Sequence, residues 1–321
     1  MTEQPWVSGG ARPDPAARET TVTAADGRTL GVAEYGPSDG FPVFSLHGTP
    51  GCRYGGPPVD HPNLFEELSL RVVGYDRPGY GRSSRQPGRA VADAAVDIVS
   101  VADALGLDEF AVMGGSGGGP HALAAAALVA DRVTRVGCVV GAAPLGASGL
   151  SQEDWVAGMT QGNVDEFQWA LEGEAALRPR VETLAQAELA AAVEDPASIL
   201  GEQYEVSDDD RAVLGDPRRH ARLVRATQEA LRHGVDGWVD DNLAMVRPWA
   251  FDVGAITAPA MVWFGLDDRL VGRTHGEWLA ANVPGAQVVR MTGGHMSLVH
   301  RSPDLFGWLA GGALPADATR G

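Results

Sequence analysis

The sequence contains no lysine, because all 25 of its basic residues are arginine. Without lysine the chain cannot form the Schiff base that holds pyridoxal phosphate. It also cannot provide the lysine of a Walker A phosphate loop or of a Ser-x-x-Lys acylase site. Three large classes of site are therefore excluded before any motif is considered.

Cysteine is nearly as scarce, since the chain has only Cys52 and Cys138. Two cysteines cannot build a disulfide framework or a four-cysteine zinc site, and such low usage is typical of a reducing compartment. The N-terminal segment has no apolar stretch of the signal-peptide kind, and no apolar run is long enough to cross a membrane. We therefore expect a cytoplasmic protein that does not associate with membranes.

Basic residues are fewer than acidic ones, 25 against 42, which gives a net charge of −17. A chain this acidic is a poor candidate for binding nucleic acids or anionic membranes, which attract basic surfaces. With 321 residues, 44% of them hydrophobic, the chain can bury a large core, so disorder over its whole length is excluded. The expected partner is a small-molecule substrate, and the composition does not determine the oligomeric state.

Short apolar runs alternate with helical patterns over most of the chain. Strands are predicted at residues 20–24, 29–35, 42–46, 72–75, 110–113, 136–140, 260–264 and 287–291. Helices are predicted at residues 63–69, 91–105, 120–129, 276–281 and 304–309. Strands that alternate with helices form a mostly parallel sheet covered by helices on both faces, so the predicted fold class is α/β.

The middle of the chain interrupts this alternation. Residues 145–248 show helical periodicity without a convincing strand, and residues 151–216 contain 16 acidic and 3 basic residues. We predict a helical insertion with solvated acidic faces, in which the three aspartates at 208–210 cap a helix or face water. The predicted organisation is a flexible tail (1–19), an α/β core (20–144 and 249–312), the insertion (145–248) and a second tail (313–321).

The most specific motif is Gly114-Gly115-Ser116-Gly117-Gly118, between a predicted strand and a predicted helix. It matches the G-x-S-x-G nucleophile elbow, whose tight turn presents a serine at the sheet edge and needs small neighbours. The N–H of Gly117 stands at the helix start and can donate to an oxyanion. The glycines would also suit a phosphate loop, but the acidic residue that a dinucleotide site needs about 20 positions later is missing.

A second glycine-rich loop, LHGTPG at 46–51, follows an earlier buried strand. Paired with the elbow, it can supply a second oxyanion donor, most simply the N–H of Thr49. Asp76 and Arg77 follow another predicted strand, and we expect them to form an ion pair or to brace their loop.

The chain resembles the α/β-hydrolase superfamily in three motifs and in their order: LHGTPG (46–51), GYDRPGYGRS (74–83) and GGSGGGP (114–120). More narrowly, the chain is similar to capped bacterial serine hydrolases of the proline-iminopeptidase-like and carboxylesterase group. The resemblance covers about residues 20–309. It implies an α/β-hydrolase fold with a helical cap inserted after the sixth strand of the sheet, where residues 145–248 fall. It also implies a catalytic triad in the chain order Ser, acid, His.

The resemblance places both partners of Ser116 in the last third of the chain. A histidine is expected after the last strand, where His295 stands, with His300 as the weaker candidate. The acid is expected in the loop after the preceding strand. Its usual position in the family, three residues after a glycine, favours Asp268 over Asp267.

These assignments predict an acyl-enzyme mechanism. His295 would take the proton of Ser116, Asp268 would orient the imidazole, and the N–H groups of Thr49 and Gly117 would bind the oxyanion. This chemistry requires neither a metal nor an organic cofactor. The predicted function is hydrolysis of a carboxylic ester or lactone of a small to medium apolar substrate.

The cap is expected to cover Ser116 and to form most of the substrate pocket. Its aromatic content favours apolar substrates, although each large side chain could instead belong to the cap's own core. The candidate lining residues are Trp155, Met159, Phe167, Trp169, Trp238 and Met245.

Other functions remain open on the same residues. A cap carboxylate could bind the N-terminal amine of a peptide, as in an aminopeptidase of the proline-iminopeptidase type. A C–C hydrolase, a thioesterase or a cyclase would use the same triad, because one fold hosts many reactions. A receptor that binds a small molecule under the cap with slow turnover is the alternative that is not primarily an enzyme.

Overall fold

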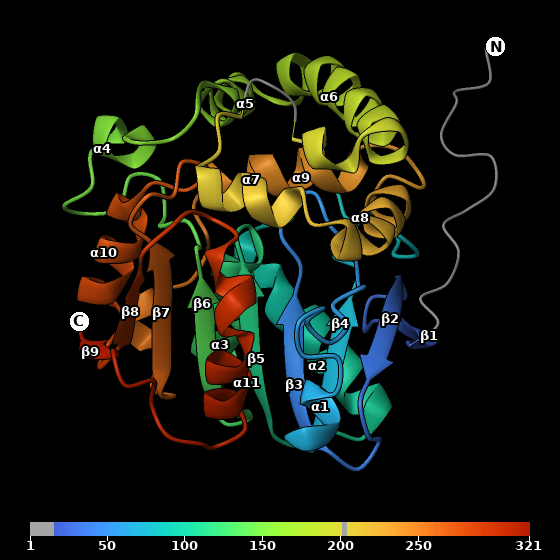
Figure 1. The fold of residues 1–321 in the computed structure, drawn as a ribbon, viewed down its shortest axis with the longest axis vertical. Helices are drawn as coiled ribbons and strands as arrows, with labels where there is room; N and C mark the ends of the chain where they lie inside the picture. Colours follow the sequence, from blue (N-terminus) through green and yellow to red (C-terminus); the bar gives the residue numbers. More distant parts are fainter. Residues whose placement is uncertain (1–15, 201–203) are drawn as a thin grey trace.

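Within the described residues, 16–200 and 204–321, nine strands form one sheet that runs through the molecule (Figure 1). The coordinates come from a computed structural model. Most of the predicted N-terminal tail, residues 1–15, lies outside the described residues. The last two residues of that predicted tail, Arg18 and Glu19, begin the first strand instead.

The strands alternate with helices along the chain, as the sequence predicts. They are β1 (Arg18–Thr23), β2 (Thr29–Tyr35), β3 (Phe41–Leu46), β4 (Leu70–Tyr75), β5 (Phe110–Gly115), β6 (Val133–Val139), β7 (Ala260–Gly265), β8 (Gln287–Met291) and β9 (Thr319–Arg320). Their order in the sheet is β1-β2-β4-β3-β5-β6-β7-β8-β9. Strands β3 to β8 run parallel, whereas β1, β2 and β9 pair antiparallel with their neighbours.

Helices cover both faces of the sheet (Figure 1). One face carries α2 (Ala94–Leu105), α3 (Gly118–Leu128) and α10 (Arg273–Asn282), and the other carries α1 (Leu64–Glu67) and α11 (Ser302–Leu309). Alternate residues of a strand point to opposite faces, so a strand in this position must be apolar throughout. In β5, Val112 packs with Leu123 of α3, whereas its neighbour Ala111 packs in the cluster of Phe306 of α11.

Six further helices stand between β6 and β7 in the described chain. They are α4 (Gln152–Val156), α5 (Gln161–Glu172), α6 (Glu174–Glu194), α7 (Asp208–Leu214), α8 (Pro217–Ala230) and α9 (Asp236–Met245). They form a layer above the carboxyl ends of the parallel strands (Figure 1), and all of them fall in the segment 145–248 that the sequence marks as an insertion. Throughout the described chain, every helix is too short or too polar to span a membrane.

The predicted second tail, residues 313–321, is partly a strand. Strand β9 pairs antiparallel with β8, and the N–H of Gly321 donates to the carbonyl of Ala286 at 3.0 Å. This pairing supplies partners to the backbone groups at the edge of β8, which an edge strand otherwise leaves open. The short polar segment gives no sign of the pairing, because the contact depends on a strand about 30 residues away.

Candidate active site

Ser116 occupies a tight turn between β5 and α3. Its φ is +53°, a value that residues other than glycine rarely adopt. The turn leaves no space for a side chain at Gly114, since a Cβ there would overlap the carbonyl oxygen of Gly118. The N–H of Ser116 donates to the carbonyl of Val139 in β6 at 2.9 Å. This backbone geometry presents a serine side chain at the carboxyl edge of the sheet.

His295 and Asp268 meet on the loops that follow β8 and β7. The Nδ1–H of His295 donates to Oδ2 of Asp268 over 2.8 Å. The other oxygen, Oδ1, accepts the backbone N–H groups of Leu270 and Val271, both at 2.9 Å. The carboxylate is thus oriented by its own loop as well as by the imidazole.

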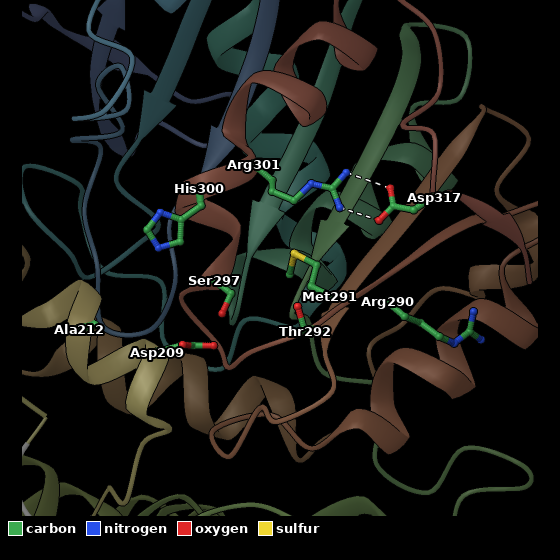
Figure 2. Close-up of a pocket in the computed structure, with 9 residues that line it drawn as sticks. All are labelled: Asp209, Ala212, Arg290, Met291, Thr292, Ser297, His300, Arg301 and Asp317. Carbon is green, nitrogen blue, oxygen red and sulfur yellow. Dashed lines mark hydrogen bonds and ion pairs between the residues drawn. The ribbon is translucent and has the colours of Figure 1, made fainter.

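The two weaker candidates lie elsewhere. The side chain of Asp267 is exposed to solvent. His300 lines a separate open cavity that also contains the ion pair of Arg301 with Asp317 (Figure 2). The acid and the histidine that the sequence analysis preferred are therefore the two that hydrogen-bond in the structure.

The surroundings of His295 favour its protonated form. Burial alone would lower the pKa of the imidazole. The charge and hydrogen bond of Asp268, together with the charge of Asp210, outweigh this effect of burial. The pKa of His295 therefore lies above its ordinary value of 6.5. Asp268 can thus stabilise the imidazolium that forms when a general base takes a proton.

We expect hydrolytic activity to be lost as the pH falls through the raised pKa of His295. A general base must be neutral, so kcat/KM should show an acid limb at a pH above 6.5. In Asp268→Asn the limb should move to lower pH, while kcat falls by about 10⁴-fold, by analogy with measured triads. The measurement is a pH–rate profile of both proteins. An acid limb at the same pH in the variant would contradict the role given to Asp268.

Thr49 and Gly117 lie side by side at the elbow. A Cβ placed on Gly117 would be 3.3 Å from the backbone nitrogen of Thr49 and 2.3 Å from its Oγ1. Neither of the two amide hydrogens is donated to an acceptor in the described part of the chain. Both N–H groups can therefore donate to a ligand oxygen, which is the pair of donors that an oxyanion site needs.

The substitution Gly117→Ala is expected to reduce kcat far more than Gly115→Ala. The new methyl group would collide with the side chain of Thr49 and push the two donors apart, and loss of one such donor costs about 10²- to 10³-fold in kcat. A methyl group at Gly115 meets nothing within 4 Å. The measurement is kcat on one ester, with thermal unfolding as a check on folding. Equal losses in the two variants would rule out the contact with Thr49 as the cause.

Two cavities open on Ser116. The smaller, of about 70 Å³, is lined by Ser116, Thr49 and Gly117 together with side chains of α5 and α9. The larger, of about 250 Å³, is lined by Ser116, Thr49 and His295 together with mainly aliphatic side chains from the insertion. A reacting group bound at Ser116 would therefore have space on two sides.

Three of the six candidate lining residues border the smaller cavity. Phe167 comes from α5, and Trp238 and Met245 come from α9. Trp238 and Met245 are seven positions apart in one helix, so they fall on the same face of α9.

The prediction for the other three residues is corrected. Trp155, Met159 and Trp169 are not among the described residues that line either cavity. Trp155 is buried and donates from Nε1 to the carbonyl of Ala143 at 2.8 Å, and Met159 packs against the same core cluster. Trp169 lies under the guanidinium of Arg180, 5.1 Å from its ring centroid. In the described chain all three make packing contacts away from the two cavities at Ser116.

A family model described as "alpha/beta hydrolase fold" matches residues 42–301, which is most of the chain. This chain belongs to the α/β-hydrolase fold family. Among curated proteins, it is similar to a non-heme chloroperoxidase from Streptomyces lividans, with 32% identity over 154 residues (47% of this chain, 54% of the relative). It is also similar to a proline iminopeptidase from Arabidopsis thaliana, with 34% identity over 116 residues (35% of this chain, 30% of the relative). The chain thus spans about half, or less, of these relatives.

A solved structure of a thermophilic esterase from Thermogutta terrifontis is similar over almost the whole chain. The two share a TM-score of 0.59 and 20% identity, and the match covers 91% of this chain and 98% of the esterase. At this level of identity the likeness shows the common α/β-hydrolase fold.

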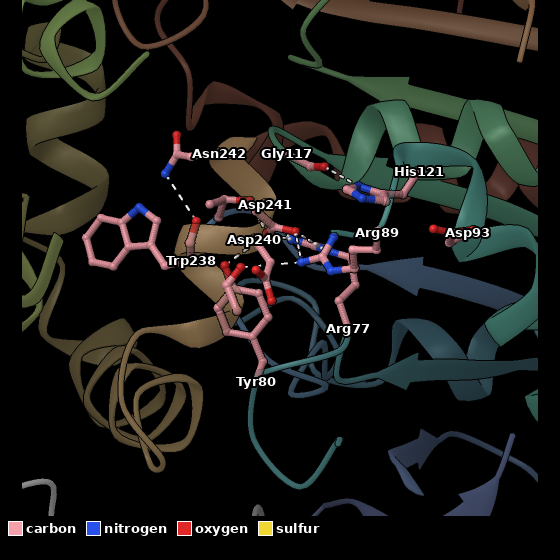
Figure 3. A network of polar contacts seen from close by, with 12 residues as sticks. Arg77, Tyr80, Arg89, Asp93, Gly117, His121, Trp238, Asp240, Asp241 and Asn242 are labelled. Carbon is pink, nitrogen blue, oxygen red and sulfur yellow. Dashed lines mark hydrogen bonds and ion pairs between the residues drawn. The ribbon is translucent and has the colours of Figure 1, made fainter. Parts of the chain in front are cut away.

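In this member of the α/β-hydrolase fold family, a buried aspartate of the insertion, Asp241, meets Arg77 and Arg89 (Figure 3). Asp241 of α9 accepts the hydroxyl of Thr49 at 2.5 Å, and it pairs with Arg77 at 2.6 Å and Arg89 at 2.5 Å. Arg77 in turn donates to the carbonyl oxygen of Gly48 at 2.8 Å. Burial alone would raise the pKa of Asp241, but the two guanidinium groups hold it well below its usual range.

Asp76 and Arg77 brace separate loops and do not pair with each other. Arg77 pairs with Asp241, whereas Asp76 pairs with the buried Arg53 at 2.7 Å and accepts the N–H of Arg82 at 2.9 Å. Neighbours on an extended backbone point to opposite sides, so adjacency in the sequence does not make them partners. The prediction of a loop brace holds for each residue, while an ion pair between them is wrong.

A second buried aspartate holds the loop of His295. Asp210 of α7 accepts the backbone N–H groups of His295 at 3.0 Å and Met296 at 2.6 Å. The sequence analysis placed this residue in a helix cap or in water, and instead its side chain is fully buried. The acidic run shows that a helix begins here, but it does not show which carboxylate turns inward.

The sequence contains a partial signal for Asp241. In a helix, a residue shares its face with residues three and four positions away. Asp241 is three positions after Trp238 and four before Met245, and both of these were expected to face the pocket. The spacing therefore placed a carboxylate on the pocket side of α9, although it did not reveal the arginines that meet it.

The residues described by the structure form no obvious cofactor site. No group of three or more His, Cys, Asp or Glu side chains in residues 16–200 and 204–321 converges as metal ligands would. Cys52 and Cys138 are buried free thiols. Burial raises the pKa of Cys138 to about 12, which disfavours the thiolate that a nucleophile needs.

Proposed function

We propose that this protein is a serine hydrolase that cleaves a carboxylic ester or lactone of a small to medium apolar substrate through an acyl-enzyme. The observation that carries the proposal is the arrangement around Ser116. The serine stands in a left-handed turn, the imidazole of His295 is bonded to Asp268, and the free N–H groups of Thr49 and Gly117 lie beside the same cavities.

The reaction follows from these positions. Oγ of Ser116 attacks the carbonyl carbon while Nε2 of His295 takes the hydroxyl proton, and the oxyanion forms between the N–H groups of Thr49 and Gly117. The bond to the leaving oxygen then breaks, and this oxygen takes the proton from His295. Water attacks the acyl-enzyme, His295 takes its proton and passes it to Ser116, and the acid is released. Asp268 holds Nδ1–H throughout.

The test is hydrolysis of a panel of esters, lactones, thioesters and amides, combined with intact-mass analysis after an acid quench. We expect esters or lactones to be hydrolysed and one acyl group to be added to the wild-type protein. Hydrolysis of thioesters or amides with no ester turnover would assign the triad to a different reaction. Tight binding of an ester without any acyl adduct would favour a receptor.

The aminopeptidase alternative depends on a carboxylate that is free to bind an ammonium group. Glu166 lines the smaller cavity, but its oxygens already accept hydrogen bonds from Tyr204, Trp238 and Asn242, so a substrate ammonium would have to displace one of these donors. Glu188 lines the larger cavity, but burial raises its pKa well above the usual range, and a neutral carboxyl is a weak partner for an ammonium group. We therefore expect aminoacyl naphthylamides to be poorer substrates than acetate esters. The reverse order would support the activity named for the plant relative.

A further inference from the structure

The two cavities at Ser116 differ in which catalytic groups they contain. The larger cavity includes His295, whereas the smaller one includes Gly117 and lacks His295. In the proposed reaction, His295 gives its proton to the leaving oxygen. The leaving alcohol must therefore lie on the His295 side, in the larger cavity, and the acyl group must lie in the smaller one.

The volumes of the cavities set different limits on the two halves of a substrate. The smaller cavity has a volume of about 70 Å³ and the larger one about 250 Å³. The acyl half of a substrate is therefore limited to a shorter chain than the alcohol half.

The walls of the smaller cavity are fixed by a buried carboxylate. Glu166 accepts the Nε1–H of Trp238 at 2.9 Å, the amide of Asn242 at 3.2 Å and the hydroxyl of Tyr204. Widening the cavity would break hydrogen bonds to a buried group, which is costly. The limit on acyl length is therefore built into the insertion.

The larger cavity is mainly aliphatic but contains one carboxyl group without a partner. Glu188 of α6 is 8% exposed and forms no hydrogen bond or ion pair in the described chain. Burial and the charge of Glu166 raise its pKa well above the usual range, which favours the neutral carboxyl. A buried polar group without a partner is unfavourable unless a ligand satisfies it. The aliphatic lining residues are Ile199, Leu200, Leu214, Leu223, Ala226, Ala230 and Leu270.

We propose that the preferred substrates are esters that join a short acyl group, such as acetyl, to a longer apolar alcohol that carries a hydroxyl group able to bind Glu188. This inference rests on the proposed serine hydrolase function and names its substrate class. The unequal cavities determine the direction of the ester, and Glu188 determines the polar group on the alcohol.

A pair of isomers tests the direction of the ester. Hexyl acetate and ethyl hexanoate have the same composition, but the long chain belongs to the alcohol in the first and to the acyl group in the second. We expect kcat/KM to be about 10- to 200-fold higher for hexyl acetate than for ethyl hexanoate, which is the range measured for a single misfitting methylene. Equal values, or a preference for ethyl hexanoate, would overturn the assignment of the cavities.

The role of Glu188 is tested with 6-hydroxyhexyl acetate and hexyl acetate. In the wild type we expect the hydroxylated ester to have the lower KM. Glu188→Leu keeps the approximate volume and should reverse this order, whereas Glu188→Gln keeps hydrogen bonding and should preserve it. The same order of KM values in Glu188→Leu would show that the carboxyl group does not bind the alcohol.

A separate measurement distinguishes failure of this inference from failure of the proposed function. Wild-type protein is treated with a fluorophosphonate and, independently, with 4-nitrophenyl acetate. If the folded protein neither forms the adduct nor hydrolyses the nitrophenyl ester, the serine hydrolase function is overturned and this inference with it. If both reactions occur and ethyl hexanoate is the better isomer, only the assignment of the two cavities is overturned.

Discussion

Replacing Ser116 with alanine is expected to remove ester hydrolysis and fluorophosphonate labelling together. The variant lacks the oxygen that attacks the carbonyl carbon, and removal of a triad nucleophile costs on the order of 10⁶-fold in kcat. Wild-type protein should gain the mass of one phosphonyl group, and Ser116→Ala should gain none. His295→Ala keeps the serine but loses its base, so it should label much more slowly.

A neighbouring serine provides the matched control for this experiment. Ser297 is buried two positions after His295, and its Oγ has no hydrogen-bond partner among residues 16–200 and 204–321. It borders the separate cavity of Figure 2. Ser297→Ala should therefore label at the wild-type rate. An adduct that persists in Ser116→Ala would place the reactive group on another residue.

The second large effect is expected at Asp241. This carboxylate is fully buried between Arg77 and Arg89 and also accepts the hydroxyl of Thr49. Asp241→Ala would leave two buried guanidinium groups without their partner, a change that costs about 3–5 kcal/mol of stability. Asp241→Asn keeps the shape of the side chain but removes its negative charge, so the interaction with the Arg77 guanidinium is weaker. The Thr49 loop should then shift, and a displacement of about 1 Å costs on the order of 10²-fold in rate.

The split between kcat and KM separates a positioning role from a purely structural one. If Asp241 positions the oxyanion donor of Thr49, Asp241→Asn should lower kcat with little change in KM, because the donor acts in the transition state. Asp240→Asn is the control. Asp240 is also buried in α9, but it pairs with Arg85 and does not contact the Thr49 loop. Equal losses of kcat in the two variants would refute the positioning role.

The strands and the elbow could be predicted from the sequence because their signals are local. A buried strand is an uninterrupted apolar run, and the turn at Ser116 needs glycines on both sides at fixed spacing. The resemblance to the α/β hydrolases implied the positions of Asp268 and His295, and their loops meet because the carboxyl ends of parallel strands lie at one edge of the sheet. The preference for Asp268 over Asp267 agrees with the hydrogen bond to His295.

The contacts of the insertion could not be predicted in the same way. Its acidic residues are many, and helical periodicity shows a face without showing what the face meets. Asp210 holds the His295 loop and Asp241 holds the Thr49 loop, across about 85 and 190 residues of chain. Trp155, Trp169 and Trp238 are the same residue type in the same predicted insertion, yet of these three described residues only Trp238 lines a cavity at Ser116.

The sequence by itself determined the fold class and the serine at the elbow, because both depend on residues close together in the sequence. The chain order of the partners was implied by the resemblance to the α/β hydrolases. Only the tertiary structure decided which carboxylates of the insertion turn inward, and how large the cavities on the two sides of Ser116 are. Both depend on helices that pack across the sheet edge, far from the motifs in the sequence. A cavity is the space left between distant side chains, so no local pattern encodes its volume.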